Sequence, residues 1–211
     1  MYEDGNLMDN RNIICVTNRS LCKGDFFERI EKIASSGVKA IILREKDLSE
    51  SEYSDLAKKF VELCEKRKVE AVLHTYVDAA IELGVKSIHL PLPVFKDLSS
   101  EKKGFFSKVG VSCHSVEDAL EAEKLGASYI TFGHVFATDC KKGLLPRGLD
   151  ALKNVCRAVK IPVYAIGGID EKNAASAIGS GAFGVCIMSG FMKCADPGKL
   201  VEKLKAGAEN D

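Results

Sequence analysis

Two cations follow one of the apolar stretches that the sequence predicts to be strands. Arg44 and Lys46 come directly after the run Ala40-Ile41-Ile42-Leu43, with Glu45 between them. Arginine can form two parallel hydrogen bonds with a carboxylate or phosphate, and lysine adds a compact positive charge. Because Arg44 directly ends the apolar run, we expect these cations to face an anionic substrate. A solvated run of charges is the alternative.

The longest segment between predicted elements, residues 133–148, carries the side chains best suited to proton transfer and anion binding. Its sequence is GHVFATDCKKGLLPRG, which includes His134, Thr138, Asp139, Lys141 and Lys142. A long ordered loop in a compact domain is usually functional. Histidine has a pKa of about 6.5 and can accept and return a proton near neutral pH. We therefore predict that His134 is a general acid or base, with a purely structural role as the alternative.

Two glycine-containing segments predict a phosphate site. Gly167-Gly168 follow the apolar run 162–166, and Ser189-Gly190 follow the run 183–188, which ends at Met188. Glycines let backbone amides approach an anion closely, and a helix N-terminus adds a favourable partial charge. We expect these amides to hold a phosphate, with two tight turns that merely need glycine as the alternative.

The elements that must position these residues follow a regular alternation. Short β-branched apolar runs predict strands, and longer amphipathic stretches between them predict helices. The predicted strands are residues 12–17, 39–44, 70–74, 86–90, 108–112, 128–132, 162–166 and 183–188, and the predicted helices lie near 25–36, 50–67, 76–83, 94–103, 115–125, 147–159, 171–179 and 197–207. Eight such units in 211 residues match the lower size limit of a (β/α)8 TIM barrel. An open doubly wound α/β sheet, which usually has fewer strands, is the alternative. In a barrel, the loops at the carboxyl ends of the strands would bring the candidate residues together.

The composition excludes several other classes of protein. Thirty Lys and Arg balance 30 Asp and Glu, so the formal net charge is zero, which argues against a main role in binding nucleic acid or a membrane surface. With 46% hydrophobic residues and a polar N-terminus, MYEDGNLMDN, we expect one cytoplasmic domain over 1–211, in which 1–11 is a polar extension. The eight cysteines include no Cys-x-x-Cys pair, so we expect reduced, structural thiols.

A nucleotide-binding pattern and three helix starts can also be judged from sequence. Residues 179–184 fit Gly-x-Gly-x-x-Gly, but they end a predicted helix, whereas the dinucleotide motif must open one. We therefore interpret these glycines as a turn and a helix cap. Pairs three residues apart predict capped helix starts, namely Asp25 with Glu28, Ser49 with Glu52, and Ser115 with Asp118.

Together these segments resemble the thiamine-phosphate-synthase family of (β/α)8 barrels. The resemblance spans about residues 12–197 and rests on the order of VTNR (16–19), LREK (43–46), VDAA (77–80), HL (89–90), GVSCH (110–114), FGHVFATDCKKG (132–143), PVYAIGGI (162–169) and MSG (188–190). It implies that substrate is bound by Arg44, Lys46, Ser112, Thr138, Lys141, Gly168 and Ser189. With the glycine segments, the predicted phosphate and substrate site also includes Gly167, Met188 and Gly190.

The sequence departs from that family at its metal site. Synthases of the family join a pyrimidine diphosphate to a thiazole phosphate, and hold Mg²⁺ on the diphosphate with two aspartates. Here His74-Thr75 stand where the family has Asn-Asp, and Val94 stands at the second aspartate. A Mg²⁺ site normally needs carboxylate oxygens. Thr75 with Asp78 instead suggests a helix cap, and Ile42 replaces the usual glutamine before LREK.

The loop after the sixth strand suggests one branch of the family. Gly133-His134 replaces the Gly-Pro usual in synthases, which is similar to the TenI-type thiazole tautomerases. Those isomerases aromatise carboxythiazole phosphate by moving a proton, a task suited to His134. We therefore expect a cofactor-free, metal-free isomerase that binds a phosphorylated thiazole. A Mg²⁺-dependent synthase and a non-catalytic phosphate-binding barrel are the alternatives. An association with thiazole synthase and a homo-oligomeric state are open possibilities.

Overall fold

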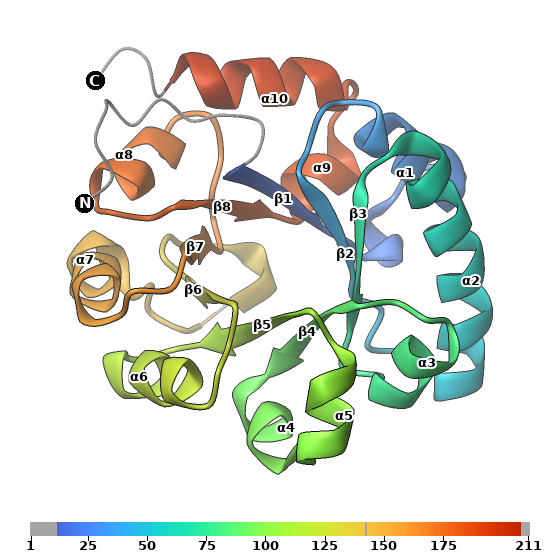
Figure 1. The fold of residues 1–211 in the computed structure, drawn as a ribbon. Coiled ribbons are helices and arrows are strands. Elements are labelled where there is room, and N and C mark those ends of the chain that lie inside the picture. Colours follow the sequence, from blue (N-terminus) through green and yellow to red (C-terminus); the bar gives the residue numbers. More distant parts are fainter. Residues whose placement is uncertain (1–11, 142, 208–211) are drawn as a thin grey trace.

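Eight parallel strands form a closed barrel in a computed structural model that describes residues 12–141 and 143–207. Each strand pairs with its neighbours in chain order, and β8 pairs with β1 to complete the circle. The helices surround this circle of strands (Figure 1). The predicted (β/α)8 barrel is thus confirmed, and the open doubly wound sheet is excluded. The polar extension predicted at 1–11 lies outside the described residues.

The strands and helices follow the predicted alternation closely. The strands are β1 (Ile13–Val16), β2 (Ala40–Leu43), β3 (Glu70–His74), β4 (Ser87–Pro91), β5 (Lys108–Cys113), β6 (Tyr129–Gly133), β7 (Val163–Ile166) and β8 (Gly184–Ile187). The α-helices are α1 (Phe26–Ala34), α2 (Glu50–Arg67), α3 (Val77–Glu82), α4 (Leu92–Asp97), α5 (Ser100–Phe105), α6 (Val116–Lys124), α7 (Gly148–Ala158), α8 (Ala174–Gly179), α9 (Ser189–Lys193) and α10 (Pro197–Ala206). The 3₁₀ turns η2 (Arg19–Leu21) and η3 (Asp139–Lys141) lie in loops.

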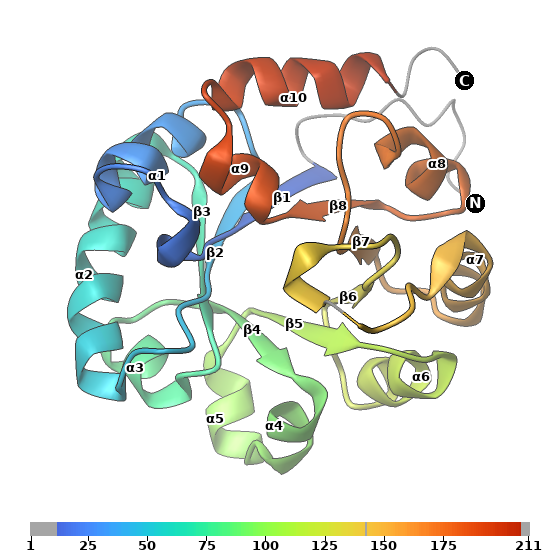
Figure 2. The same cartoon turned by 180° about the vertical axis from the view of Figure 1, so that it is seen from behind.

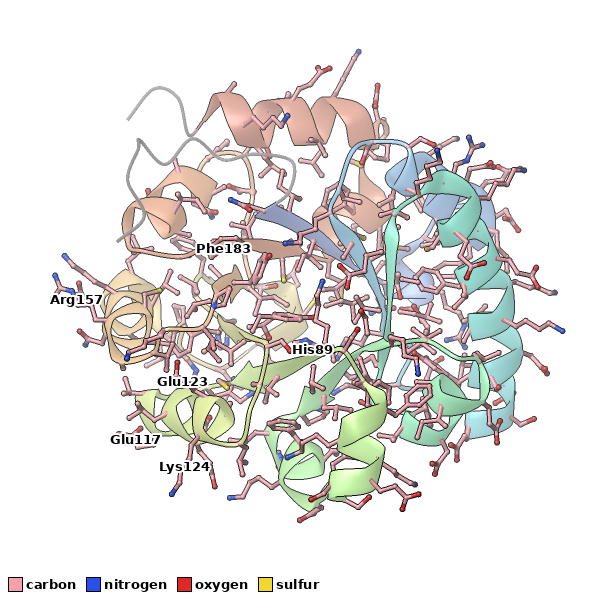
Figure 3. All side chains as sticks on the ribbon, viewed as in Figure 1. His89, Glu117, Glu123, Lys124, Arg157 and Phe183 are labelled. Carbon is pink, nitrogen blue, oxygen red and sulfur yellow. The ribbon has the colours of Figure 1, made fainter. Side chains whose placement is uncertain are left out.

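Side chains alternate along each strand between two apolar layers. One layer packs between the strands and the outer helices and contains Ile13, Ile41 and Phe132. The other fills the barrel interior and contains Ile14, Val16, Ala40, Ile42, Val72, Tyr129, Tyr164 and Cys186. Figure 3 shows His89 within the circle of strands, whereas Glu117 and Lys124 of α6 point outward. The strand ends can therefore carry side chains inward above a packed interior.

The three predicted helix starts are confirmed. The Asp25, Ser49 and Ser115 side chains each accept a hydrogen bond from the backbone N–H three residues later. At Ser49 the bond is reciprocal, because the Glu52 carboxylate accepts from the Ser49 backbone N–H at 2.9 Å. The glycines of residues 179–184 end α8 and precede β8, which confirms that this segment is a turn.

Two local predictions are wrong. The helix expected near 94–103 is two helices, because Leu98 is extended and the Ser99 side chain begins α5 by accepting from the Lys102 backbone N–H. Thr75 does not cap α3: Tyr76 holds that position without a side-chain hydrogen bond.

All eight cysteines are free thiols. Among the described residues, no helix has both the length and the apolar character needed to cross a membrane.

Candidate functional site

The candidate residues lie at one end of the barrel. The strands are parallel, so the loops that follow them emerge on the same face. Arg44 and Lys46 follow β2, Ser112 lies near the end of β5, and the remaining candidates follow β6, β7 and β8. The view in Figure 2 shows α9 after β8 and the loop after β6 on the side turned to the reader. We call this end of the barrel the mouth.

Arg44 is the cation best placed to meet a ligand at the mouth. It continues the inward alternation of Ala40 and Ile42 along β2 and is half-buried. Within the described part of the chain, no hydrogen bond or ion pair engages its guanidinium. Burial lowers the pKa of Arg44, since the charged form loses water there. A half-buried cation without a carboxylate partner is costly, so this arrangement favours an anionic ligand.

Lys46 and Lys141 add positive charge beside Arg44. Burial lowers the pKa of Lys46, and the charges of Arg44 and Lys141 lower it further. Lys141 ends the 3₁₀ turn η3 in the loop after β6, and its charge acts on Lys46 in the loop after β2. The loops after β2 and β6 therefore converge. We call Arg44, Lys46 and Lys141 the cation cluster.

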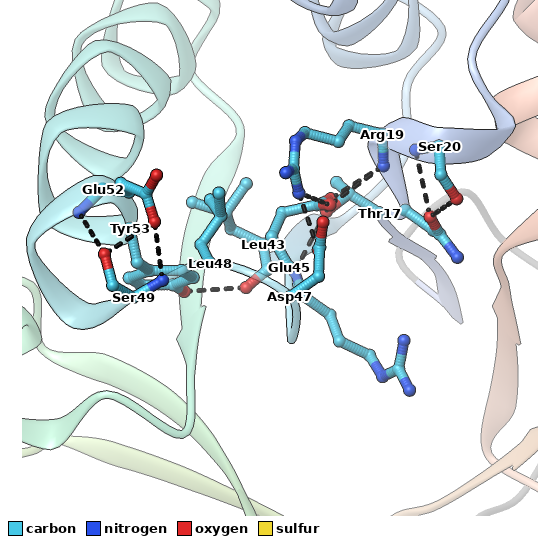
Figure 4. A network of polar contacts seen from close by, with 12 residues as sticks. Thr17, Arg19, Ser20, Leu43, Glu45, Asp47, Leu48, Ser49, Glu52 and Tyr53 are labelled. Carbon is cyan, nitrogen blue, oxygen red and sulfur yellow. Dashed lines mark hydrogen bonds and ion pairs between the residues drawn. The ribbon is translucent and has the colours of Figure 1, made fainter.

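The residue between the first two cations has a different role, which the sequence did not reveal. Glu45 is 3% exposed. Its carboxylate accepts from the Thr17 hydroxyl at 2.6 Å and from the Arg19 backbone N–H at 3.0 and 3.1 Å (Figure 4). The Thr17 Oγ1 in turn accepts from the Arg44 backbone N–H at 3.0 Å. Glu45 thus ties the loop after β1 to the turn that presents Arg44.

A polar layer lies below the cation cluster inside the barrel. The His74 and His89 rings stack with their centroids 5.9 Å apart. Burial lowers the pKa of His89 to about 3. Burial, with the charges of His89, Arg44 and Lys46, lowers the pKa of His74 to about 2. Both rings are therefore neutral at physiological pH.

Ser112, one of the predicted site residues, belongs to this layer. Its hydroxyl lies 2.9 Å from His89 Nε2, and His89 Nδ1 lies 3.2 Å from the Tyr129 hydroxyl. A neutral histidine can donate from one ring nitrogen and accept at the other. The orientation of the Ser112 hydroxyl is therefore coupled to the tautomer of His89. No sequence pattern links Ser112, His89 and Tyr129, since they come from three different strands.

His134 lies in the tightly packed loop after β6. Its ring Nε2 is 3.3 Å from the Leu144 carbonyl oxygen of the same loop. The preceding peptide bond, Gly133–His134, is cis. The Gly133 carbonyl accepts from Arg147 Nε at 3.0 Å and lies 2.8 Å from His114 Nδ1. These contacts hold the loop backbone and turn the His134 ring toward the loop.

The glycines after β7 are needed by packing between loops. Gly167 and Gly168 have φ values of 92° and 69°, which most side chains rarely adopt. A Cβ at Gly168 would lie 2.5 Å from the Ala137 carbonyl oxygen, and one at Gly167 would lie 2.3 Å from the His134 Cβ. The tight-turn alternative therefore accounts for both glycines. A phosphate held by these amides and by Ser189 and Gly190 is still a prediction, as is substrate binding by Thr138 and Met188.

The residues at the family's two metal positions do not fit Mg²⁺. The Thr75 hydroxyl lies 2.7 Å from His74 Nδ1, and Val94 is an apolar residue of α4 packed against the core. The acidic residue nearest to Thr75 in sequence, Asp78, pairs with Lys102 Nζ at 2.6 Å. In residues 12–141 and 143–207, no group of three His, Cys, Asp or Glu is placed to hold a metal ion. Mg²⁺ prefers oxygen ligands that include carboxylates, and these positions supply none.

A family profile and sequence relatives indicate one family. A family profile described as Thiamine monophosphate synthase matches residues 13–191. Thiamine-phosphate synthase from Clostridium acetobutylicum is 35% identical over 181 residues, covering 84% of this chain and 85% of the relative. Putative thiamine-phosphate synthase 2 from Aquifex aeolicus is 35% identical over 186 residues, covering 88% of this chain and all of the relative (100%).

A solved structure gives the same result. Thiamine phosphate pyrophosphorylase from Pyrococcus furiosus superposes with a TM-score of 0.79 at 28% identity, covering 95% of this chain and 96% of that one.

These relatives correct the predicted activity. The prediction of a thiazole tautomerase is wrong, because relatives about 35% identical over most of their length are named thiamine-phosphate synthases. The acid–base role of His134 was predicted for that reaction and stays a prediction. The names support the synthase that was the alternative, and they favour an enzyme over a non-catalytic barrel. The family profile does not separate the TenI-type branch from the rest. This chain belongs to the thiamine monophosphate synthase family.

Proposed function

We propose that this chain is a thiamine-phosphate synthase, a transferase that joins a pyrimidine carried on a diphosphate to a thiazole phosphate. The names of its relatives support this activity. The observation that carries it in the structure is the Arg44 guanidinium, which is half-buried at the mouth with no ion pair or hydrogen bond to any described residue. A diphosphate is a ligand that such a cation would bind well.

The cation cluster suits the chemistry of this transfer. A bond forms between the thiazole and the pyrimidine carbon that carries the diphosphate, while the C–O bond to the diphosphate breaks. Pyrophosphate leaves with the electron pair, so negative charge grows on its oxygens. Positive groups held in place before the reaction stabilise that charge without further reorganisation. Arg44, Lys46 and Lys141 would therefore act on the leaving group.

The other predicted residues would position the second substrate. The amides of Gly167, Gly168, Ser189 and Gly190 would bind the thiazole phosphate, and the hydroxyls of Ser112 and Thr138 would contact the substrates. Met188 would line the site at the end of β8. We further propose that the enzyme acts in the cytoplasm and that it can form a homo-oligomer or associate with thiazole synthase.

The test is a direct assay of the coupled reaction. Purified protein is mixed with the pyrimidine diphosphate and the thiazole phosphate, with Mg²⁺ or with EDTA, and thiamine phosphate and pyrophosphate are measured. We expect both products in equal amounts. Arg44→Gln should lower kcat by about 10²–10³-fold, the effect typical of removing one donor that stabilises transition-state charge. Lys124→Gln, a charge loss on the outer face of α6, is the matched control and should keep wild-type turnover (Figure 3). Failure to form thiamine phosphate in either buffer would refute the proposal.

A further inference from the structure

We propose that this chain binds the diphosphate without a divalent cation, and that Arg44 and Lys46 supply the positive charge that a metal ion would otherwise bring. This inference rests on the proposed function for the identity of the anion. Its first support is the donor chemistry at the family's metal positions. A threonine hydroxyl beside a histidine ring and a valine side chain offer no negative charge to a cation.

The second support is the sign of the charge at the mouth. The charges of Arg44 and Lys141 both act against that of the Lys46 ammonium. A Mg²⁺ ion placed among them would be repelled by all three unless carboxylates balanced the charge. Glu45 cannot serve, because Thr17 and Arg19 already engage both of its oxygens. The charges of Arg44, Lys46 and Lys141 therefore favour an anion over a free cation.

The third support comes from the polar layer below the cation cluster. A metal site could in principle recruit His74 or His89, since neutral imidazole is a common ligand. His74 Nδ1 lies 2.7 Å from the Thr75 hydroxyl, and both nitrogens of His89 face hydroxyl groups, of Tyr129 and Ser112. These rings are neutral, so they do not offset the positive charge above them. The interior thus adds hydrogen-bonding groups to the site but no anionic ligand.

The backbone at Thr75 allows a test in which the two missing carboxylates are introduced by substitution. Thr75 has a φ of 70°, a conformation that is unusual for a β-branched residue and more readily adopted by aspartate. Thr75→Asp is therefore compatible with the local backbone. Val94 is half-buried on α4, so Val94→Asp can be reached by solvent. The double variant Thr75→Asp/Val94→Asp supplies the two carboxylates that the present chain lacks.

The experiment is a calorimetric titration of the full chain with inorganic pyrophosphate, in EDTA and in excess Mg²⁺. We expect the two dissociation constants to agree within about 3-fold, and Arg44→Gln to weaken binding in EDTA by about 10-fold or more, as expected for losing a charge-assisted pair. Lys124→Gln should bind as the wild type does. Thr75→Asp/Val94→Asp should bind more weakly in EDTA and recover with Mg²⁺.

The outcomes separate this inference from the proposed function. Wild-type affinity that falls by more than about 3-fold in EDTA and returns with Mg²⁺ overturns it, as does pyrophosphate that fails to bind in either buffer. Undiminished binding in Arg44→Gln also overturns it, because the anion would then be held elsewhere. If the double variant does not fold, the wild-type and Arg44→Gln titrations still decide. Metal-free binding by a protein that forms no thiamine phosphate would support the inference and refute the synthase activity.

Discussion

At the scale of single residues, Glu45 links the fold to the proposed chemistry. It sits between two cations in sequence, and its carboxylate accepts hydrogen bonds in a buried network with Thr17 and Arg19. That network also fixes the Arg44 backbone through Thr17 Oγ1. Glu45 is thus a positioning residue. It acts on the cation cluster through Thr17 and the Arg44 backbone, and we expect no direct contact between Glu45 and substrate.

Replacing Glu45 should therefore affect both stability and turnover. In Glu45→Gln, an amide NH₂ faces donors that the carboxylate now accepts from, which leaves buried donors without acceptors. We expect the free energy of unfolding to fall by about 1–3 kcal/mol, with a loss of turnover that exceeds the loss of folded protein. Urea unfolding followed by circular dichroism measures the first quantity.

The matched control for Glu45→Gln is Asp47→Asn. Asp47 pairs with the same Arg19 guanidinium at 2.7 Å, but its side chain is 65% exposed. Exposed ion pairs contribute about 0–1 kcal/mol, so this variant should stay within that range. Equal losses in the two variants would show that burial of Glu45 does not govern the network.

The place of Arg44 at the end of β2 was predictable from sequence, whereas the burial of its neighbour Glu45 was not. Arg44 directly follows the continuous apolar run Ala40-Ile41-Ile42-Leu43, and that run is visible in sequence. The partners of Glu45 come 26 and 28 residues earlier, and only the pairing of β1 with β2 brings them together. A charged residue within a charged run gives no sign of such burial.

At the scale of elements, the loops after β6 and β7 behave as one packed unit. The Phe136 backbone N–H donates to the Gly167 carbonyl at 3.0 Å, and the Val135 N–H donates to the Ile166 carbonyl at 3.0 Å. Gly168 lies directly against the backbone of residues 136 and 137. A change in one loop is therefore transmitted to the other, which carries Lys141.

This contact predicts that one added methyl group at Gly168 strongly lowers the free energy of unfolding. In Gly168→Ala, the new Cβ would meet the Ala137 carbonyl oxygen at 2.5 Å in addition to adopting a positive φ. Gly84→Ala is the matched control, with a φ of 71° and open space around the new atom. In the control, the free energy of unfolding should fall by about 1–2 kcal/mol because of the positive φ alone. In Gly168→Ala it should fall clearly more. Thermal unfolding of both variants measures the difference.

An equal loss of unfolding free energy at both positions would mean that the loop after β6 moves aside without an energetic cost. In that case Gly168 would be kept free for a ligand, as the phosphate prediction holds, and the variant should weaken binding of inorganic phosphate. The element boundaries themselves were largely predictable, because eight short apolar runs mark the strands. The division of one expected helix into α4 and α5 was not, since Ser99 lies inside an amphipathic pattern that runs past it.

At the scale of the whole molecule, the buried histidines make stability depend on pH. In the unfolded chain both rings titrate near pH 6.5, whereas in the barrel the pKa of His89 is about 3 and that of His74 about 2. As the pH falls below about 6.5, the unfolded chain binds protons that the folded barrel does not. The free energy of unfolding therefore falls with falling pH, down to about pH 3, by up to about 1.4 kcal/mol per pH unit for each ring.

Urea unfolding between pH 7.5 and 5 should show this slope, in a window that lies above the titration of most carboxylates. His89→Gln keeps groups that can hydrogen-bond to Ser112 and Tyr129 but cannot be protonated, so it should remove roughly half of the slope. Stability that is flat over this range in the wild type, or an unchanged slope in the variant, would show that the rings take up protons within the fold.

The closure of the barrel between β1 and β8 also has a consequence during synthesis on the ribosome. Ile13 pairs with Val185, so the first strand completes its hydrogen bonds only after nearly the whole chain has been made. At about 5–20 residues per second, that interval lasts roughly 10–30 s. Throughout it, the nascent chain exposes the unpaired edge of β1 and the edge of the most recently made strand, and such edges can pair with other chains. The growing polypeptide, rather than the finished enzyme, is the form most exposed to aggregation and most in need of a chaperone.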